Sequence, residues 1–416
     1  WHLRFPTLAQ ALDMDTKQGD ELSMMNDSLL AELETLGVLP SDSVVAENTI
    51  AVQDSIPPKA QPVIPEVNVS NTDSRTYLAA FYAALDSVRT MPVRVVHYGD
   101  SQIEEDRITN VLRERWQKAY GGGGVGLLPL HQTIPTRSMR QWLSMDGVVQ
   151  TVQGGPKRYL VYGPRSMRLD NDEYGVMGQV AVMDSTLVAG SQDIKLHIEP
   201  AGKKRLPYHY FSRVRLLTDS VNLTLLSPSI NDSLALMDSI YTVQLPDSTT
   251  QCDMRLQGKG RVYGISLENP TGLIVDNIPM RGCLGLVFNK IDSTQLTHFY
   301  RNENVTLIIM QFGGNAIPFN EKPSTIQSIV RGLRQQVRYI QSCAPHASIL
   351  FIGPSDMLTT IDGVEQSYPM VSYMDRLLHK MALEEHIAYF SLFRWMGGNG
   401  SMARWKEIGL AGSDGI

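Results

Sequence analysis

The sequence has little cysteine. Its 416 residues include three, Cys252, Cys283 and Cys343, which lie far apart in the chain. That number is too small and the spacing too wide for a disulfide framework or for a metal site built from thiolates. The nine histidines show no HExxH motif or other ligand spacing. We therefore expect neither a metal nor another cofactor.

The sequence also lacks a long hydrophobic run. No stretch approaches the ~18 to 20 apolar residues of a membrane span, and no signal peptide is visible. The chain begins at Trp1 rather than at a methionine and stops at Ile416 without a closing segment, so we interpret it as a piece of a longer reading frame. A signal peptide or membrane anchor, if the protein has one, is then expected upstream of Trp1.

An excess of positive charge is absent as well. The 37 Lys and Arg residues are outnumbered by 43 Asp and Glu residues, which gives a net charge of −6. A nucleic-acid-binding protein needs a basic surface to neutralise phosphates, so that class is disfavoured. Apolar residues make up 43% of the chain and charged residues 19%, which allows a sizeable core and excludes wholesale disorder. The length predicts two to three domains.

The residue pattern predicts an extension followed by a split α/β domain. Residues 1–72 are predicted to be an N-terminal extension or linker, because frequent prolines remove backbone donors and break regular structure. Residues 73–126 and 268–416 alternate apolar strands with amphipathic helices, so we expect them to form one α/β domain that is discontinuous in sequence. In its first part, a strand of residues 93–98 precedes a helix of residues 103–120.

Residues 127–267 are predicted to form an inserted β-sandwich. Short β-rich runs, among them residues 214–217 and 221–225, are separated by Gly, Pro, Asn, Asp and Ser. Their spacing of roughly 8–12 residues is typical of a sandwich or barrel. No long helix is expected in this part.

Four short motifs place polar groups where an α/β sheet binds ligands. Gly99-Asp100-Ser101 puts a hydroxyl on a tight turn after a strand and at the N-terminus of the predicted helix, where backbone N–H groups favour negative charge. Taken alone, Ser101 is at least as well interpreted as an ordinary helix cap. Gly282 and Asn315 follow later strands, and each alone is equally typical of a turn or cap. The fourth motif is Asp414-Gly415-Ile416.

In this order the motifs resemble the SGNH (GDSL-type) esterase and acyltransferase superfamily. Its signature runs Gly-Asp-Ser near the start, Gly in the middle, Gly-x-Asn later and Asp-x-x-His close to the end. The chain matches with Gly99-Asp100-Ser101, Gly282, Gly313-Gly314-Asn315 and Asp414, and the histidine would be the residue after Ile416. The resemblance covers residues 74–126 and 268–416. It implies a flavodoxin-like three-layer α/β fold with a parallel sheet.

The resemblance also assigns roles to the matching residues. Ser101 would be the nucleophile, and Asp414 would orient the missing histidine. The oxyanion hole would consist of the Ser101 N–H, the Gly282 N–H and the Asn315 side chain. Because the histidine that acts as general base is not in the sequence, the chain as written is expected to be nearly inactive.

A closer resemblance is to the bacterial peptidoglycan O-acetylesterases, which carry a carbohydrate-binding-like β module between the first and second motifs. It rests on residues 97–102, Asp106-Arg107 and residues 276–282. Gln102 departs from the His or Leu common after the serine, and Cys283 stands where a small residue is common. The resemblance implies a periplasmic or otherwise extracytoplasmic serine esterase that removes acetyl or similar small acyl groups from a cell-envelope polysaccharide such as peptidoglycan. Two alternatives stay open: an O-acetyltransferase that uses the same serine, and a non-catalytic glycan-binding envelope protein on the same fold.

Other features are weaker candidates. Residues 121–126 are rich in glycine, but they follow a helix and lack the Lys-Ser/Thr of a phosphate loop, so we interpret them as a flexible wall or hinge. His209 is expected on a sandwich-surface strand rather than at a sugar platform. Cys283 is expected to be a buried, inert thiol. Three tryptophans could stack on sugar rings, but we expect them to be core or half-buried residues instead: Trp142, Trp395 and Trp405.

Overall fold

The computed structural model describes most of the chain after residue 63. Described are residues 64–412 and 415, except for residues 71, 146–147, 150–156, 184–192, 226–232, 235–239 and 319. Most of the predicted linker of residues 1–72 therefore lies outside the described residues, and so does Asp414. Within the described part, no helix is long and apolar enough to cross a membrane.

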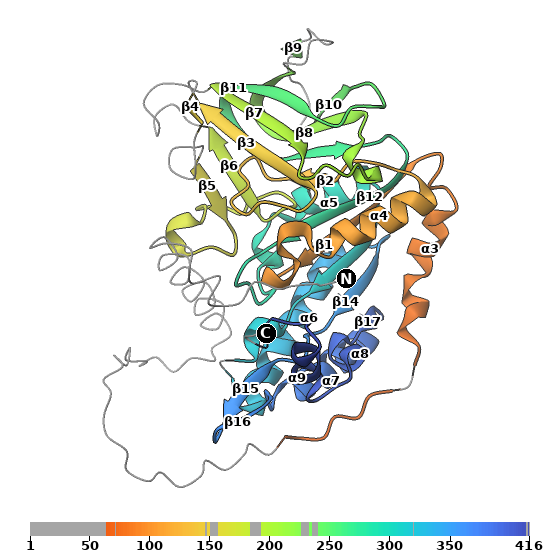
Figure 1. Ribbon diagram of the computed structural model, residues 1–416, viewed down its shortest axis with the longest axis vertical. Coiled ribbons are helices and arrows are strands. Elements are labelled where there is room, and N and C mark those ends of the chain that lie inside the picture. Colours follow the sequence, from red (N-terminus) through yellow and green to blue (C-terminus); the bar gives the residue numbers. More distant parts are fainter. Residues whose placement is uncertain are drawn as a thin grey trace.

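A parallel sheet forms the centre of the α/β part (Figure 1). Within the described residues it has five strands, in the order β12 (Gly272–Pro279), β1 (Pro92–Gly99), β13 (Val305–Gln311), β14 (Ser348–Ile352) and β17 (Ala388–Phe390). Counted along the α/β chain alone, this is the order 2-1-3-4-5 of flavodoxin-like folds. The predicted flavodoxin-like α/β architecture is confirmed.

Helices cover both faces of the sheet, which makes three layers. Successive side chains of a strand point to opposite faces. Val95 of β1 packs in one cluster with Phe81 of α3, whereas its neighbour Val96 packs in another cluster with Leu333 of α6. The strands are almost continuously apolar because helices cover both faces of the sheet. The main helices are α3 (Ala79–Leu85), α4 (Thr109–Tyr120), α5 (Ser293–Asn302), α6 (Pro323–Cys343) and α7 (Val371–Glu384).

Shorter elements complete the described α/β part. A hairpin and two short helices follow β14: β15 (Leu358–Ile361), β16 (Val364–Ser367), α8 (Leu392–Met396) and α9 (Ser401–Glu407). The 3₁₀ turns used below are η2 (Ser101–Asp106) and η6 (Gly314–Ala316), and η1 (Ser74–Leu78) and η5 (Phe288–Lys290) also belong to this part.

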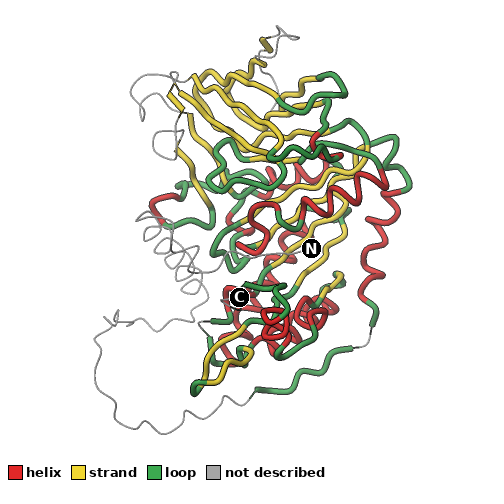
Figure 2. Tube along the Cα trace, viewed as in Figure 1, coloured by secondary structure: helices red, strands yellow, loops and turns green. Residues whose placement is uncertain are grey.

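The inserted part is an antiparallel β module that stands above the α/β layers in Figure 1 and appears as the dense group of strands in Figure 2. Its centre is β11 (Cys252–Glu268), which pairs with β8 (Arg213–Leu225) on one side and with β7 (Asp193–Pro200), β6 (Gln179–Met183) and β2 (Gly126–Leu128) on the other. The module has a core of its own, which includes Leu196, Leu216 and Met254. Its other elements are β3 (Met139–Met145), β4 (Val148–Val149), β5 (Lys157–Leu160), β9 (Ser233–Leu234), β10 (Ile240–Gln244), η3 (Arg165–Met167) and η4 (Pro207–His209).

Strand β8 corrects one expectation. Residues 214–217 and 221–225 were expected to be separate strands, but they belong to a single strand of 13 residues. The pairing of β8 with β11 shifts register between Gly258 and Arg261 and again between Val262 and Gly264. Bulges of this kind let a strand bend while it keeps pairing, so the polar residues in the middle of β8 do not form a turn.

The helix expected over residues 103–120 is wrong in its first part. The α-helix begins at Thr109, and residues 101–106 form the 3₁₀ turn η2. Glu105 and Asp106 have φ angles of 57° and 47°, a left-handed conformation that is uncommon for residues with a side chain and breaks the helix. Ser101 therefore does not stand at the N-terminus of an α-helix.

Four of the five glycines in residues 121–126 form a tightly packed wall, so the expectation of a hinge is wrong for them, whereas Gly121 has nothing within 4 Å of its Cβ position. Gly124 has a φ of +72°, and a Cβ atom on it would lie 1.9 Å from the carbonyl oxygen of Leu267 in β11. The backbone between α4 and β2 thus passes directly against the end of β11. A side chain at this position would push the module away from the α/β part.

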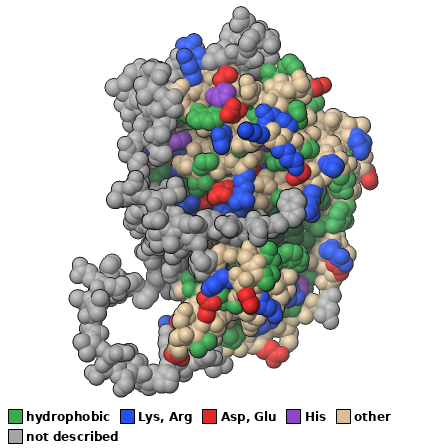
Figure 3. All heavy atoms as spheres, in the orientation of Figure 1, with side chains coloured by type: hydrophobic (Ala, Val, Ile, Leu, Met, Phe, Trp, Pro, Cys, Tyr) green, Lys and Arg blue, Asp and Glu red, His purple; other side chains and the backbone are tan. Residues whose placement is uncertain are grey.

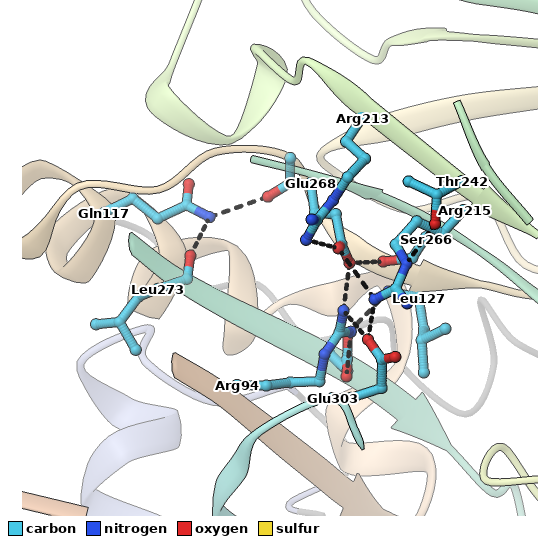
Figure 4. Close-up of polar contacts among 12 residues, drawn as sticks. Arg94, Gln117, Leu127, Arg213, Arg215, Thr242, Ser266, Glu268, Leu273 and Glu303 are labelled. Atoms are coloured by element: carbon cyan, nitrogen blue, oxygen red, sulfur yellow. Dashed lines mark hydrogen bonds and ion pairs between the residues drawn. The ribbon is translucent and has the colours of Figure 1, made fainter. Parts of the chain in front are cut away.

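A buried network of charges joins the module to the sheet (Figure 4). Glu268, at the end of β11, accepts hydrogen bonds from Arg94 of β1 and Arg213 of β8. Burial alone would raise the pKa of Glu268, but the surrounding arginines lower it to about 2. The network has equal numbers of cations and anions, so its charges are balanced. Its members are Arg94, Arg213, Arg215, Glu268, Asp276 and Glu303.

Candidate active site

Three of the four sequence motifs meet at the carboxyl ends of adjacent strands. Gly99, the last residue of β1, is in register with Pro279 of β12 and with Gln311 of β13. The Met280 N–H donates to the Gly99 carbonyl at 2.8 Å, and the Asp100 N–H donates to the Gln311 carbonyl at 3.4 Å. The loops that carry Ser101, Gly282 and Asn315 therefore begin at one edge of the sheet. Between β1 and β13 the strand order reverses, which is where open α/β sheets bind ligands.

Ser101 is the first residue of η2 and is half-buried. The sharp turn before it depends on Gly99, because a Cβ atom there would lie 3.0 Å from the Ile103 side chain and 3.2 Å from the Gln311 carbonyl. Asp100, rather than Ser101, caps the turn: its Oδ1 accepts from the Gln102 N–H at 2.9 Å. The interpretation of Ser101 as a cap is thus wrong, which leaves its hydroxyl available for other partners.

The Asp100 carboxyl is fully buried. Burial raises its pKa to about 7, the hydrogen bond from Gln102 opposes that rise, and the nearby Glu104 carboxylate adds to it. A carboxyl that changes charge near neutral pH therefore adjoins Ser101. Perturbed groups of this kind are common at functional sites.

Gly282 and Asn315 are positioned as donors beside this turn. Gly282 has a φ of +73°, in the left-handed region that favours glycine. Asn315 lies in η6, and its Nδ2 donates to the Cys283 carbonyl at 3.1 Å, which joins the second and third motif segments. Since an amide nitrogen has two hydrogens, one remains for a ligand. Within the described residues, the N–H groups of Ser101 and Gly282 have no hydrogen-bond acceptor.

A chain of side-chain hydrogen bonds next to the serine turn was not predicted from the sequence. His97 Nε2 is 3.1 Å from Gln311 Oε1, Gln311 Nε2 donates to Gln102 Oε1 at 3.2 Å, and Gln102 Nε2 donates to Ser355 Oγ at 3.1 Å. The chain links the ends of β1, β13 and β14. Polar residues in buried strands were its one signal in the sequence.

His97 is buried too completely to act as the general base. Burial lowers its pKa to about 4, so the imidazole is neutral at physiological pH. Its Nε2 is held by Gln311 inside the sheet. A histidine in this position contacts Gln311 and has no access to a substrate.

The turn is also tied to the Gly282 loop by an ion pair. Arg281 donates from Nε and Nη2 to the two carboxylate oxygens of Glu104, at 2.7 and 2.8 Å. Fork-to-fork contact of this kind fixes orientation as well as distance. It holds the residue before Gly282 against the segment that carries Ser101.

The C-terminal motif is represented by Gly415, because Asp414 lies outside the described residues. The Gly415 carbonyl accepts from the Leu358 N–H at 2.9 Å. Leu358 follows β14 and is three residues beyond Ser355, which receives the hydrogen bond from Gln102. This contact brings residue 415 toward the sheet edge that holds Ser101. The role of Asp414 stays a prediction.

Asp356, in the same loop, is another residue that the sequence did not single out. It is fully buried, and its Oδ2 accepts from the Met402 N–H at 2.9 Å. Its Oδ1 has no partner among the described residues. This buried carboxylate oxygen can accept one more hydrogen bond.

The weaker candidates have mixed outcomes. His209 is neither on a strand nor at a surface: it is buried in η4, with Nε2 3.0 Å from the Ser138 carbonyl, so both expectations for it are wrong. The Cys283 thiol is fully buried, as predicted. Trp395 is 64% exposed, against the expectation of a core or half-buried residue. No cluster of potential metal ligands occurs within the described residues.

The strand order, the serine turn at the switch point and the glycine and asparagine loops on the flanking strands together define a flavodoxin-like α/β fold with a candidate site at its switch point. No family model and no curated protein sequence matches the chain. Among solved structures, a peptidoglycan O-acetylesterase shares the fold, with a TM-score of 0.59 and 20% identity over 83% of this chain and 92% of that chain. The resemblance stated from the motifs is confirmed at the level of the fold.

Two further solved structures match much more weakly. Est24, a carbohydrate acetylesterase from Sinorhizobium meliloti, has 15% identity and a TM-score of 0.22 over 29% of this chain and 63% of that chain. A family two carbohydrate esterase from Cellvibrio japonicus has 10% identity and a TM-score of 0.22 over 61% of this chain and 89% of that chain. Superpositions this poor add nothing to the assignment of the fold.

Proposed function

We propose that this chain belongs to a serine esterase that removes O-acetyl or similar small acyl groups from a cell-envelope polysaccharide such as peptidoglycan. The observation that carries the proposal is the register of Gly99 with both Pro279 and Gln311, from which the Ser101, Gly282 and Asn315 loops start side by side. A nucleophile flanked by two kinds of N–H donor is the arrangement that acyl transfer requires.

In the proposed reaction Ser101 Oγ attacks the carbonyl carbon of the ester, and a histidine base takes the hydroxyl proton. The resulting oxyanion is held by the N–H groups of Ser101 and Gly282 and by Asn315 Nδ2. The sugar alkoxide leaves with the proton from the histidine, and water then releases the acyl group from Ser101. Asp414 is proposed to orient the histidine. Because His97 is fully buried and its pKa is lowered to about 4, we propose that the base is another histidine.

A polysaccharide substrate is supported by the position of the inserted module. The segment after Ser101 is bonded directly to it, since Asp106 accepts hydrogen bonds from the Arg137 N–H at 2.9 Å and from the Ser138 hydroxyl. A glycan lying on the module would thus be close to the nucleophile. A solved structure that shares the fold is a peptidoglycan O-acetylesterase. For this substrate we propose an extracytoplasmic location.

The test uses the protein as its gene encodes it, with O-acetylated peptidoglycan as substrate and released acetate as the readout. Ser101→Ala is expected to lower the rate of acetate release by about 10⁴-fold or more. Ser324→Ala, at an exposed position on α6, is the control and should leave the rate unchanged. Acetyl that appears on added glycan acceptors without free acetate would instead identify an acetyltransferase. A rate that survives Ser101→Ala would show that Ser101 is not the nucleophile, and a wild-type protein that binds the glycan but releases no acetate would be a glycan-binding protein.

A further inference from the structure

A cavity of about 150 Å³ lies at the junction of the module and the α/β part. The nucleophile segment and the Gly282 loop line it through Glu104 and Arg281, and the module lines it with Arg158 and Met177. Glu104 is three residues after Ser101, so the cavity and the candidate active site share this segment. A space of about 150 Å³ is large enough for one six-membered ring.

The charged groups around the cavity differ in how they are paired. Glu104 is bound by Arg281, and Asp106 by Arg113 at 2.7 Å. Arg158 has a neutral partner within the described residues, since its Nη1 donates to the Thr133 hydroxyl at 3.2 Å. A guanidinium that is not already matched by a carboxylate can bind an anionic group of a ligand without breaking an ion pair.

The neighbour of Arg158 does not add to the charge. His131 also lines the cavity. Burial and, to a smaller extent, the Arg158 guanidinium lower its pKa. The imidazole is therefore neutral at neutral pH. Arg158 is left as the positive group on the module side of the cavity, while the neutral His131 can donate one hydrogen bond and accept one.

The rest of the lining suits an uncharged ring. Asn277 donates from Nδ2 to the Ile103 carbonyl at 3.1 Å, and its Oδ1 is buried without a hydrogen-bond partner among the described residues. This oxygen can accept from an O–H or N–H group of a ligand. Leu127 and Met177 add apolar surface for the C–H groups of a ring. Apolar walls with a few convergent polar groups are typical of ligand pockets.

We infer that this cavity binds a carboxylate-bearing sugar residue of the glycan, with Arg158 holding the carboxylate and Asn277 receiving a hydroxyl or amide N–H. The inference rests on the proposed function for the nature of the ligand. In peptidoglycan, the sugar that carries a lactyl ether has such a carboxylate wherever its stem peptide has been removed. The cavity then fixes the position of the chain while a neighbouring residue presents its ester to Ser101.

Two unacetylated disaccharides that differ by the lactyl group test the inference. The probes are N-acetylglucosaminyl-N-acetylmuramic acid and N,N′-diacetylchitobiose, titrated calorimetrically into the protein as its gene encodes it. The lactyl disaccharide is expected to bind at least tenfold more tightly. Arg158→Gln should remove that preference, and Arg158→Lys should retain part of it because the charge remains. Arg140→Gln, at an exposed position on β3, is the matched control and should keep the full preference.

Equal affinities for the two probes, or a preference that survives Arg158→Gln in a protein of unchanged melting temperature, would overturn the inference. Hydrolysis of a small acetate ester by the unsubstituted protein is measured in parallel. If that hydrolysis is absent while the preference for the lactyl disaccharide is present, the proposed esterase activity fails and the binding site stands. If hydrolysis is present and the preference absent, the site fails and the esterase stands.

Discussion

The guanidinium of Arg94 donates from Nη1 to both carboxylate oxygens of Asp276, at 2.9 and 3.0 Å. Both side chains are fully buried, and they lie on the adjacent strands β1 and β12. Asp276 Oδ1 also accepts from the Leu127 N–H at 2.8 Å, at the entry to the module. One carboxylate thus connects the strand that ends at the serine turn, the strand that leads to Gly282, and the inserted module.

Glu268→Gln is the sharpest test of this network. The substitution keeps the shape of the side chain but leaves Arg94, Arg213 and Arg215 with less negative charge in a buried site. Breaking a buried ion network in this way costs about 3 to 5 kcal/mol. We expect that loss in the free energy of unfolding measured with urea. Glu173→Gln, in a surface pair with Arg261, is the control and should cost less than about 1 kcal/mol.

The same substitution changes the response to acid. In the folded protein the arginines lower the pKa of Glu268 to about 2, below its ordinary value of 4.5. Its stabilising contribution is therefore present above about pH 4.5 and is lost as the pH falls toward 2. The difference in unfolding free energy between wild type and Glu268→Gln should shrink over that range. A difference that stays constant would contradict the assigned pKa.

Gly124→Ala tests the contact between the glycine wall and β11. The new Cβ would lie 1.9 Å from the Leu267 carbonyl oxygen, and the φ of +72° disfavours any side chain. Overpacking usually costs about 1 to 3 kcal/mol, and the backbone conformation adds about 1 kcal/mol. Gly202→Ala is the control, since nothing lies within 4 Å of its Cβ position. Similar melting temperatures for the two variants would show that the wall is not tightly packed.

Much of the α/β fold could be predicted because its signals are local. The apolar runs of β1 and β13 are long and continuous, and the helical spacing of α6 is regular. The break at Glu105 and Asp106 could not be predicted, because it depends on Asp106 being held by Ser138, which is 32 residues away. The continuity of β8 likewise depends on bulges in its pairing with β11. Tertiary contacts override local propensity in both cases.

The candidate site was predictable where short motifs follow strands. Ser101, Gly282 and Asn315 were found in this way, and the register of β1 with its two neighbours brings their loops together. The Glu104–Arg281 pair and the contact between Gln102 and Ser355 were missed. Each of these joins residues 177 or more positions apart, and no local pattern indicates such a partner.

Asn315→Ala tests the proposed oxyanion hole. The substitution removes the Nδ2 donor and its contact with the Cys283 carbonyl. Loss of one oxyanion donor typically lowers kcat by about 10² to 10³-fold, with little effect on KM, because the interaction strengthens in the transition state. Asn302→Ala, at an exposed position on α5, should leave kcat unchanged. A kcat for Asn315→Ala within twofold of wild type would remove Asn315 from the proposed machinery.

The stability of the serine turn should depend on the charge of Asp100. Burial raises its pKa to about 7 in the folded protein, from an ordinary value of 3.8. Between these values the folded state binds more protons than the unfolded state, so the free energy of unfolding falls as the pH rises. The contribution of Asp100 is thus fully present below about pH 4 and is lost above about pH 7.

Asp100→Asn removes this dependence and keeps the cap, because an amide oxygen can still accept from the Gln102 N–H. Relative to wild type, the variant is expected to gain stability steadily from about pH 4 to pH 7 and then to level off. The gain should exceed about 1.4 kcal/mol, the equivalent of a single pKa unit. Urea unfolding at a series of pH values measures it, with Asp86→Asn at an exposed position as the control. If the variant and the wild type keep a constant difference across this range, the Asp100 carboxyl titrates normally and the burial of charge beside Ser101 has no energetic consequence.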